Sequence, residues 1–200
     1  MAYSDFTFSK VKAEFGLLID ESRNLFATVD EVTPSDFLKQ ALEEYLPLAT
    51  AINTEKARSE LLIAPIMTEV RRQAKHQVSL FSGTDFNVDQ SKGLVGSCDF
   101  IISGSREQFD ITAPVLTVVE AKNENIKAGL GQCIATMIAA QLFNQKAGNE
   151  IKTVYGAVTS GTTWRFITLS GSTVLIDSLE YYIVQTDKIL GILLKTTHKE

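Results

Sequence analysis

The feature that most constrains this fold is an apolar run that ends in charge. Residues 115–119 contain four aliphatic side chains and one threonine, and Glu120-Ala121-Lys122 follow directly. A β-branched run without polar alternation is typical of a strand covered on both faces, as in sheets flanked by two layers of helices. We therefore expect a buried central strand over 115–122, and no apolar stretch here approaches the roughly 20 residues that a membrane-spanning helix needs.

Helical patterns precede this strand. Helices are predicted over 9–16, from Thr33 to Ala49, and over 54–73. In the second, Thr33 can act as N-cap and Pro34 suits the first helical position, after which apolar residues recur at helical spacing. Pro65 would kink the third helix, because proline lacks the backbone N–H that the helix needs there.

Strands dominate the rest of the chain. Strands are predicted at 86–89, 95–102, 153–159, 164–169 and 172–176, and helices at 132–146 and 187–197. Gly129-Leu130-Gly131 reads as the opening of the helix from Gln132, and Gly171 as the turn of a final hairpin. Helices alternating with such strands predict a mixed sheet with helices packed against it.

The charge balance limits how this chain can meet nucleic acid. The net charge is −5 and the isoelectric point is about 5.2. Since phosphate neutralisation dominates nucleic-acid affinity, binding would require a local basic patch, a bound cation or a partner. Cys98 and Cys133 lie far apart and form no C-x-x-C pair, which indicates reduced thiols in a cytoplasmic protein. The first residues lack the pattern of a secretory signal.

Two acids and a lysine are placed where chemistry is expected. Asp99 follows the start of one predicted strand, while Glu120 and Lys122 end the next and project to the same face. If the two strands are adjacent, Asp99 lies beside Glu120. Paired carboxylates of this kind hold a hard cation such as Mg²⁺, which can polarise a phosphodiester and activate water. A lysine beside them can orient that water or stabilise developing charge.

These segments resemble the core of the PD-(D/E)XK nuclease superfamily. The similarity rests on 95–99, on 118–122, on the helix that carries Gln132, and on 57–66, which look like the first core helix of that superfamily. The resemblance covers roughly 60–169. It implies a three-layer α/β/α fold like that of restriction endonucleases, with a central mixed β-sheet.

The resemblance also implies roles and boundaries. By that likeness Asp99 is the central metal ligand, Glu120 the second and Glu60 an additional one. Lys122 is the catalytic lysine, and Gln132 is the helix residue that completes the site. We expect one domain over 1–200, with an N-terminal helical part at 1–52, a nuclease core at 53–170, and a C-terminal strand and helix at 171–200.

The function implied is metal-dependent phosphodiester hydrolysis, with DNA as the favoured substrate. Mg²⁺ would be the cofactor, with Mn²⁺ as a substitute, and the protein would act away from membranes, with a homodimer as one option for cutting two strands. The rival hypothesis is a non-catalytic interaction protein on the same fold, which the acidic isoelectric point favours. A third is a metal-dependent hydrolase of small phosphate esters.

Each candidate also has a purely structural interpretation. An E-x-K sequence at a strand end often forms a solvated salt bridge of little energetic value. Glu60 reads equally well as a surface residue of a helix, and Gln132 as a residue that satisfies a helix start. The basic stretch at 71–76 can face phosphate or be an ordinary solvated helix end.

Overall fold

A mixed sheet forms the middle of the molecule. The computed structural model describes residues 1–198. Within that range the strands are β1 (Leu18–Asp20), β2 (Ser79–Asp85), β3 (Ser97–Ser103), β4 (Val115–Ala121), β5 (Val154–Thr159), β6 (Thr163–Ser170), β7 (Thr173–Ile176) and β8 (Tyr181–Tyr182). Their order is β1-β7-β6-β5-β4-β3-β2, with β8 paired to β6. The pairs β1–β7 and β4–β5 are parallel, and the other neighbouring pairs are antiparallel.

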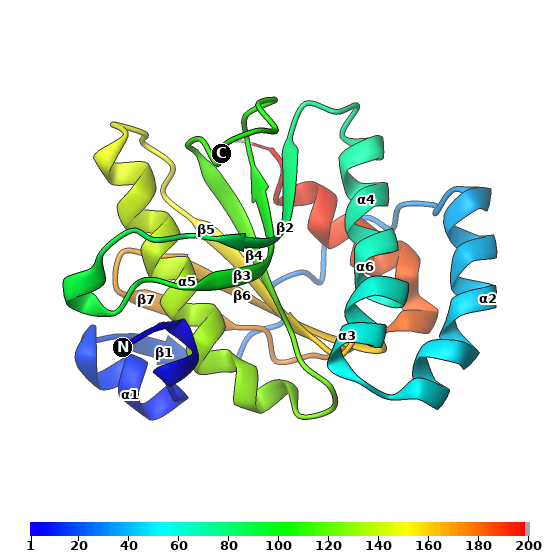
Figure 1. Cartoon of the computed structure of the whole chain (residues 1–200), viewed down its shortest axis with the longest axis horizontal. Helices are drawn as coiled ribbons and strands as arrows, with labels where there is room; N and C mark the ends of the chain where they lie inside the picture. The colour runs from blue at the N-terminus through cyan, green and yellow to red at the C-terminus, as the bar shows by residue number, and fades with distance from the viewer. Residues whose placement is uncertain (199–200) are drawn as a thin grey trace.

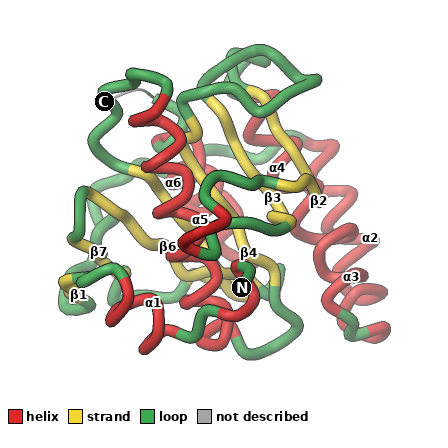
Figure 2. The backbone as a smooth tube through the Cα atoms, turned by 60° about the vertical axis from the view of Figure 1, so that its left-hand side comes forward, coloured by secondary structure: helices red, strands yellow, loops and turns green. Residues whose placement is uncertain are grey.

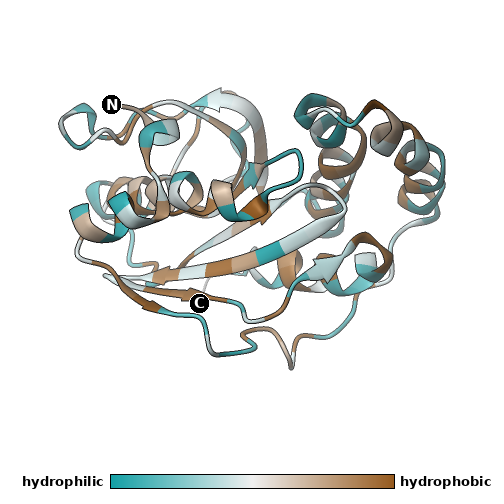
Figure 3. Ribbon diagram, turned by 90° about the horizontal axis from the view of Figure 1, so that it is seen from below, coloured by the Kyte–Doolittle hydropathy of each residue, from teal (hydrophilic) through white to brown (hydrophobic). Residues whose placement is uncertain are grey.

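Helices cover both faces of this sheet. They are α1 (Phe8–Glu14), α2 (Asp36–Ile52), α3 (Glu55–Arg58), α4 (Ala64–Gln73), α5 (Ile126–Lys146) and α6 (Thr186–Lys195). Figure 1 shows α1 and α5 on one side of the sheet and α2, α4 and α6 on the other. The chain therefore has the expected three-layer α/β/α arrangement with a mixed sheet. Figure 3 shows hydrophilic stretches on the helices and largely hydrophobic or neutral colours along the strands.

The central strand behaves as its sequence predicts. Every residue of β4 is buried, and its neighbours are β3 on one side and β5 on the other. Val118 packs in the core under α5, whereas Val119 packs in the core under α4 and α6. Burial on both faces explains why the run shows no polar alternation.

The long helix α5 begins earlier than predicted. It starts at Ile126, not at Gln132, and the side chain of Asn125 caps it by accepting from the Ala128 N–H at 3.3 Å. Gly129 and Gly131 lie inside the helix. Both positions need glycine, because other chain segments approach them too closely for a side chain. A Cβ on Gly131 would collide with the backbone at Phe6, and Figure 2 places the N-terminus beside α5.

The same helix bears on the membrane question. By length and composition α5 could cross a membrane, contrary to the expectation that no segment of the chain could. In the structure it is a core helix that packs against β4 and β5, and 61% of its most apolar window is buried. Its hydropathy therefore reflects burial under the sheet.

Other helix boundaries differ from prediction by a few residues. Ser35, not Thr33, caps α2, its hydroxyl accepting from the Leu38 N–H at 3.2 Å. Thr7 caps α1, so that helix starts before Ser9. Each stretch offers more than one residue that can cap a helix, and sequence propensity alone does not rank them.

The predicted helix over 54–73 exists but contains a π turn. Residues Ser59–Ile63 form this turn between α3 and α4, and the Ala64 N–H donates to the Ser59 carbonyl. Pro65 follows immediately and has no N–H to donate, which accounts for the departure from regular α-helical bonding.

Strand placement differs most at the sheet edges. The predicted strand over 86–89 is wrong, since β2 runs earlier, pairing Ser79 with Ser103 of β3. Residues 86–96 form the turn between them, in which Asp89 accepts from the Ser91 N–H at 3.1 Å. The segment 1–52, expected to be helical, also supplies β1 at the opposite edge. The hairpin of β6 and β7 around Gly171 is confirmed.

Candidate functional site

The two predicted acids lie on adjacent strands. β3 and β4 pair antiparallel with Phe100 opposite Val119, which brings Asp99 next to Glu120. Asp99 is held there by its own carboxylate, because Oδ2 accepts from the Ala121 N–H at 2.7 Å. The condition that the sequence left open, adjacency of the two strands, is therefore met.

Glu120 and Lys122 face each other as their spacing predicts. Lys122 Nζ lies 2.6 Å from Glu120 Oε1. The Glu120 side chain is only 5% exposed and the Lys122 side chain 22%, so this is not the solvated surface pair of the structural interpretation. Gly129 makes room for the lysine, since a Cβ there would lie 3.0 Å from Lys122 Cγ.

Burial sets the charge state of the two acids. Burial raises the pKa of Glu120 to about 8; the negative charge of Asp99 adds to this effect, while the Lys122 ammonium opposes it. Burial also raises the pKa of Asp99, against the Ala121 hydrogen bond and the charge of Lys122. Each carboxylate therefore has too few donors to offset the cost of its burial as an anion, a condition that a bound cation would relieve.

Lys122 is stabilised as a cation. Burial lowers the pKa of Lys122, but the charges of Glu120, Glu55 and Asp99 outweigh burial and raise it. A buried lysine that stays protonated can donate hydrogen bonds and hold positive charge beside a reacting phosphate.

Glu55 is the residue beside the candidate site that sequence reasoning missed. It is the first residue of α3, after the N-cap Thr54, and its charge acts on Asp99, Glu120 and Lys122 alike. An acid in the first turn of a helix is usually read as a partner of the helix dipole, so its sequence position gave no separate signal.

A polar cleft opens at these residues. Its volume is about 310 Å³, and it is lined by Glu55, Lys56, Ser59, Glu60, Ser82, Gly83, Asp99 and Ala121. The π turn supplies one wall and β2 the other. Asp99 is thus accessible from the cleft, whereas Glu120 is buried and does not line it.

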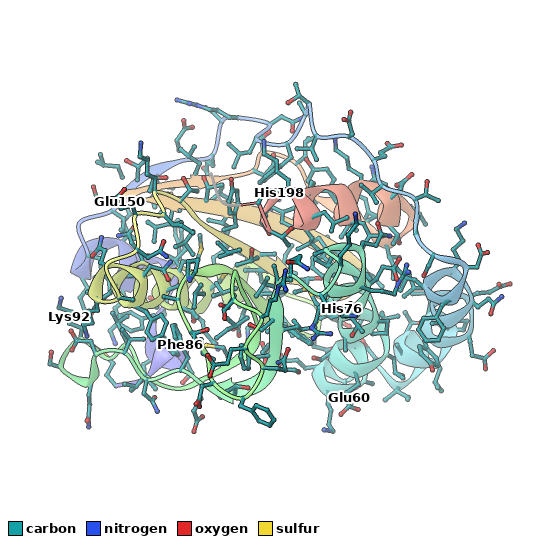
Figure 4. All side chains as sticks on the ribbon, turned by 90° about the horizontal axis from the view of Figure 1, so that it is seen from above. Glu60, His76, Phe86, Lys92, Glu150 and His198 are labelled. Carbon is teal, nitrogen blue, oxygen red and sulfur yellow. The ribbon has the colours of Figure 1, made fainter. Side chains whose placement is uncertain are left out.

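Glu60 lies at the rim of this cleft. Its side chain is 60% exposed and pairs with Lys56 Nζ at 2.8 Å, and Figure 4 shows it at the periphery of the molecule. The negative charge of Glu55, rather than that of Glu60, helps to raise the pKa values of Asp99 and Glu120. A role for Glu60 as metal ligand stays a prediction, and the electrostatics favour Glu55 for that place.

Gln132 lies in the second turn of α5. It is half-buried, and its carbonyl accepts from the Thr136 hydroxyl at 3.0 Å. Cys133 and Thr136 share a small enclosed space with Glu120 and Cys98. The helix therefore presents Cys133 and Thr136 to the buried acid, and a catalytic role for Gln132 stays a prediction.

The two thiols behave as core residues. Burial, followed by the charge of Glu120, raises the pKa of Cys98 to about 12 and that of Cys133 well above its ordinary value. Thiols that remain protonated are poor nucleophiles and poor metal ligands. The carboxylates are left as the candidate ligands.

A polar network fixes the surroundings of Glu55. Arg58 is buried and donates to Asn53 Oδ1 at 3.0 and 3.1 Å and to the Ser160 carbonyl at 3.0 Å. Asn53 in turn donates to Glu124 Oε1 at 2.8 Å. This network ties the start of α3 to the loop after β4 and to the turn after β5.

The donor set fits a cation that is completed by substrate. Within residues 1–198 no three histidine, cysteine or acidic side chains lie close enough to hold a metal ion together. Mg²⁺ typically binds proteins through one or two carboxylates, with water and substrate phosphate as the remaining ligands. Asp99 and Glu120, each with a single recorded hydrogen-bond donor in the described chain, fit that mode of binding.

Comparisons with known proteins do not assign this chain to a family. No family model, no curated protein and no solved structure matches this chain.

Proposed function

We propose that this protein is a metal-dependent phosphodiesterase of the PD-(D/E)XK type that cleaves DNA. The observation that carries the proposal is the group of Asp99, Glu120 and Lys122 on two adjacent central strands. Glu120 is buried and Asp99 half-buried, each has a single hydrogen-bond donor, and the lysine contacts Glu120 at 2.6 Å. Acids with raised pKa values beside a cleft are candidate functional groups, because a carboxylate that is poorly solvated and has few donors does not stabilise the folded state.

Each residue has a definite task in this proposal. Asp99 and Glu120 hold Mg²⁺, or Mn²⁺ in its place, and Glu55 adds negative charge that favours a cation. When bound, the cation polarises the phosphodiester and lowers the pKa of the attacking water. Lys122, held by Glu120, orients that water and stabilises the charge that develops on the phosphoryl oxygens.

The charge of the cleft favours an obligatory cation. Glu55, Glu60 and Asp99 outnumber Lys56 among the charged residues that line it. A phosphodiester would be repelled by this surface unless a divalent cation neutralised it. The net charge of −5 acts in the same direction, so DNA binding should itself depend on the metal.

A non-catalytic interaction protein is the second candidate. The same net charge favours it, and so does the Lys122–Glu120 ion pair, which neutralises two of the groups that catalysis would use. Divalent-metal binding at Asp99 and Glu120 separates the two candidates. Activity on plasmid DNA against activity on a small phosphate ester then separates a nuclease from a small-ester hydrolase.

The deciding experiment is cleavage of linear and supercoiled DNA with Mg²⁺ or Mn²⁺. Wild type is compared with Lys122→Ala and Asp99→Ala, with Lys12→Ala on the exposed face of α1 as the matched control. We expect metal-dependent cutting that both site variants lose and the control keeps, with circular dichroism unchanged. Equal cutting by wild type and both site variants would sink the proposed mechanism.

Cellular setting and assembly belong to the same proposal. The two buried cysteines are free thiols, which suits a reducing, cytoplasmic location. A homodimer would allow both strands of a duplex to be cut, and sedimentation with and without DNA tests that option.

A further inference from the structure

A glycine inside the edge strand β2 lies on the wall of the polar cleft. The strand order places β2 at one end of the sheet, with β3 as its neighbour. Gly83 and Ser82 of this strand line the cleft together with Asp99. A glycine in the interior of a strand weakens it and often marks a place where a ligand or another backbone approaches closely. The position therefore calls for a reason other than strand formation.

The backbone of Gly83 departs from strand geometry directly opposite Asp99. Its φ is +62°, in the left-handed region where residues with a side chain are strained. On either side the ladder between β2 and β3 is regular, with Ser82 paired to Phe100 and Thr84 to Cys98. Residues directly opposite each other on antiparallel strands lie about 5 Å apart. A ligand held by Asp99 in the cleft therefore lies against the backbone at Gly83.

Packing within the protein does not account for this glycine. A Cβ at Gly129 or Gly156 would collide with neighbouring side chains, whereas a Cβ at Gly83 would have no atom of the described chain within 4 Å. Gly16 and Gly171 share its left-handed φ and open surroundings, but the first lies in the turn after α1 and the second in the β6–β7 turn. The open space beside Gly83 belongs instead to the cleft.

The lining of the cleft suits a sugar–phosphate backbone better than a base. Within the described chain its residues are charged, hydroxyl-bearing or small, and none is aromatic. Bases are held by stacking on aromatic rings, whereas phosphates and sugars are contacted by serine hydroxyls and backbone N–H groups. Ser82 on β2 and Ser59 on the π turn place one hydroxyl-bearing residue on each wall. The chemistry of the walls therefore matches the backbone of a nucleic acid.

We propose that Ser82 and Gly83 form a subsite, which we name the edge subsite, for the sugar–phosphate backbone of the strand whose phosphodiester lies at Asp99. The inference rests on the proposed nuclease function and specifies how its substrate is held. Gly83 leaves room for the backbone, and the Ser82 hydroxyl donates to a phosphate oxygen. Contacts of this kind carry no sequence information. The protein therefore binds nucleic acid at the cleft without preference for base sequence.

Binding tests the edge subsite independently of hydrolysis. Full-length Lys122→Ala protein, which keeps both proposed metal ligands, is titrated with a fluorescent DNA duplex in the presence of Mn²⁺, and anisotropy is recorded. Adding Gly83→Ala should weaken binding at least roughly tenfold, because its methyl group would overfill the place of the ligand. Adding Ser82→Ala should weaken it roughly fivefold, the net effect of one lost hydrogen bond. Both losses should be equal on duplexes of unrelated sequence.

Gly171→Ala is the matched control for backbone strain. It introduces the same methyl group at a φ of +58°, again in open surroundings but outside the lining of the cleft. The two alanine variants should lower the midpoint of thermal unfolding by similar amounts, while Gly171→Ala keeps the affinity for DNA. Binding of Mn²⁺ without nucleic acid, followed by electron paramagnetic resonance, should be unchanged in Gly83→Ala, because the metal ligands stay in place.

The outcomes separate this inference from the nuclease proposal. If cleavage requires Lys122 while Gly83→Ala binds DNA no worse than Gly171→Ala, the edge subsite is wrong and the nuclease stands. If no substrate is cut but Gly83→Ala weakens binding as described, hydrolysis is wrong and the edge subsite stands. A duplex that fails to bind on any background, a loss confined to one sequence, or a loss of Mn²⁺ binding in Gly83→Ala would each overturn the edge subsite.

Discussion

Two buried glutamates in this protein have opposite electrostatic environments. Glu69 on α4 and Glu120 on β4 are 3% and 4% exposed, so burial costs both of them solvation. Burial acts to raise the pKa of each. The outcome differs because the groups around them differ, and that difference separates a structural acid from a candidate functional one.

Glu69 is surrounded by donors. Its carboxylate accepts from the Ser35 N–H at 3.0 Å and hydroxyl at 2.9 Å, from Arg72 at 3.0 and 2.6 Å, and from Gln73 at 2.7 Å. Although burial raises its pKa, these bonds outweigh burial and lower it to about 2. Glu69 thus fastens the capped start of α2 to α4, and its charge is fully used by the fold.

Within residues 1–198 the hydrogen-bond donor to Glu120 is Lys122, and burial raises the pKa of Glu120 to about 8. The fold gains little from a carboxylate held in this way. The comparison teaches that burial alone does not mark a functional acid. A candidate functional acid is one that is buried with too few hydrogen-bond donors and lies next to a cleft.

The largest expected effect is on catalysis. Glu120→Gln should reduce the proposed metal-dependent DNA cleavage by at least roughly 100-fold, because it removes a proposed metal ligand and the partner of Lys122. Glu69→Gln should leave cleavage near wild type at temperatures where the variant is folded. Single-turnover cleavage rates check the contrast, and a larger loss in the Glu69 variant would reverse it.

The next effect is on stability and runs the other way. Glu69→Ala should destabilise the fold by about 3 kcal/mol, since it leaves Arg72 and the cap of α2 without their acceptor. Glu120→Gln should be neutral or stabilising in metal-free protein, because it removes a poorly solvated charge. Urea unfolding measures both. Similar destabilisation in the two variants would break the distinction.

The two acids also predict opposite slopes of stability against pH. The pKa of Glu69 is lowered to about 2, so its contribution is complete above about pH 4.5 and is lost as the pH falls through 2. The pKa of Glu120 is raised to about 8, so metal-free protein loses stability as the pH rises from about 4.5 through 8. Unfolding at a series of pH values should show both limbs, with Glu69→Gln removing the acid one and Glu120→Gln the alkaline one.

The smallest expected effect concerns the two helical acids of the cleft. Glu55→Gln should raise the Mg²⁺ concentration needed for half-maximal cleavage by a few fold, since a charge acting on all three site residues is lost. Glu60→Gln should change it less, because that side chain is exposed and paired with Lys56. A metal titration of the two variants decides which acid supports the site, and a larger effect at Glu60 would restore the sequence-based assignment.

The central part of the site could be predicted because its signals are local. An unbroken β-branched run identifies β4, and the E-x-K spacing fixes the common face of Glu120 and Lys122. The position of Asp99 required only that two predicted strands pair. These features depend on backbone periodicity, which the sequence shows directly.

The remaining features depend on contacts between distant segments. Gly129 and Gly131 read as the opening of a helix that starts at Gln132, yet they lie within α5, where Val158 and the N-terminal segment pack too closely for a side chain. β1 has three residues and exists through its pairing with β7. Glu55 joins the site only because a network through Arg58 holds the start of α3 beside the loop after β4.

The π turn carries a consequence for sequence change. Inward-facing pairs occur at 57–58, 62–63 and 66–67, a spacing of five residues followed by four, so the turn contains one residue more than a regular helix needs. That surplus lies on the outer side, where Glu60 is exposed. A homologue lacking one residue at this turn would keep both flanking pairs buried and align with a single gap. An acid at this rim can therefore be gained or lost by insertion or deletion without repacking the core.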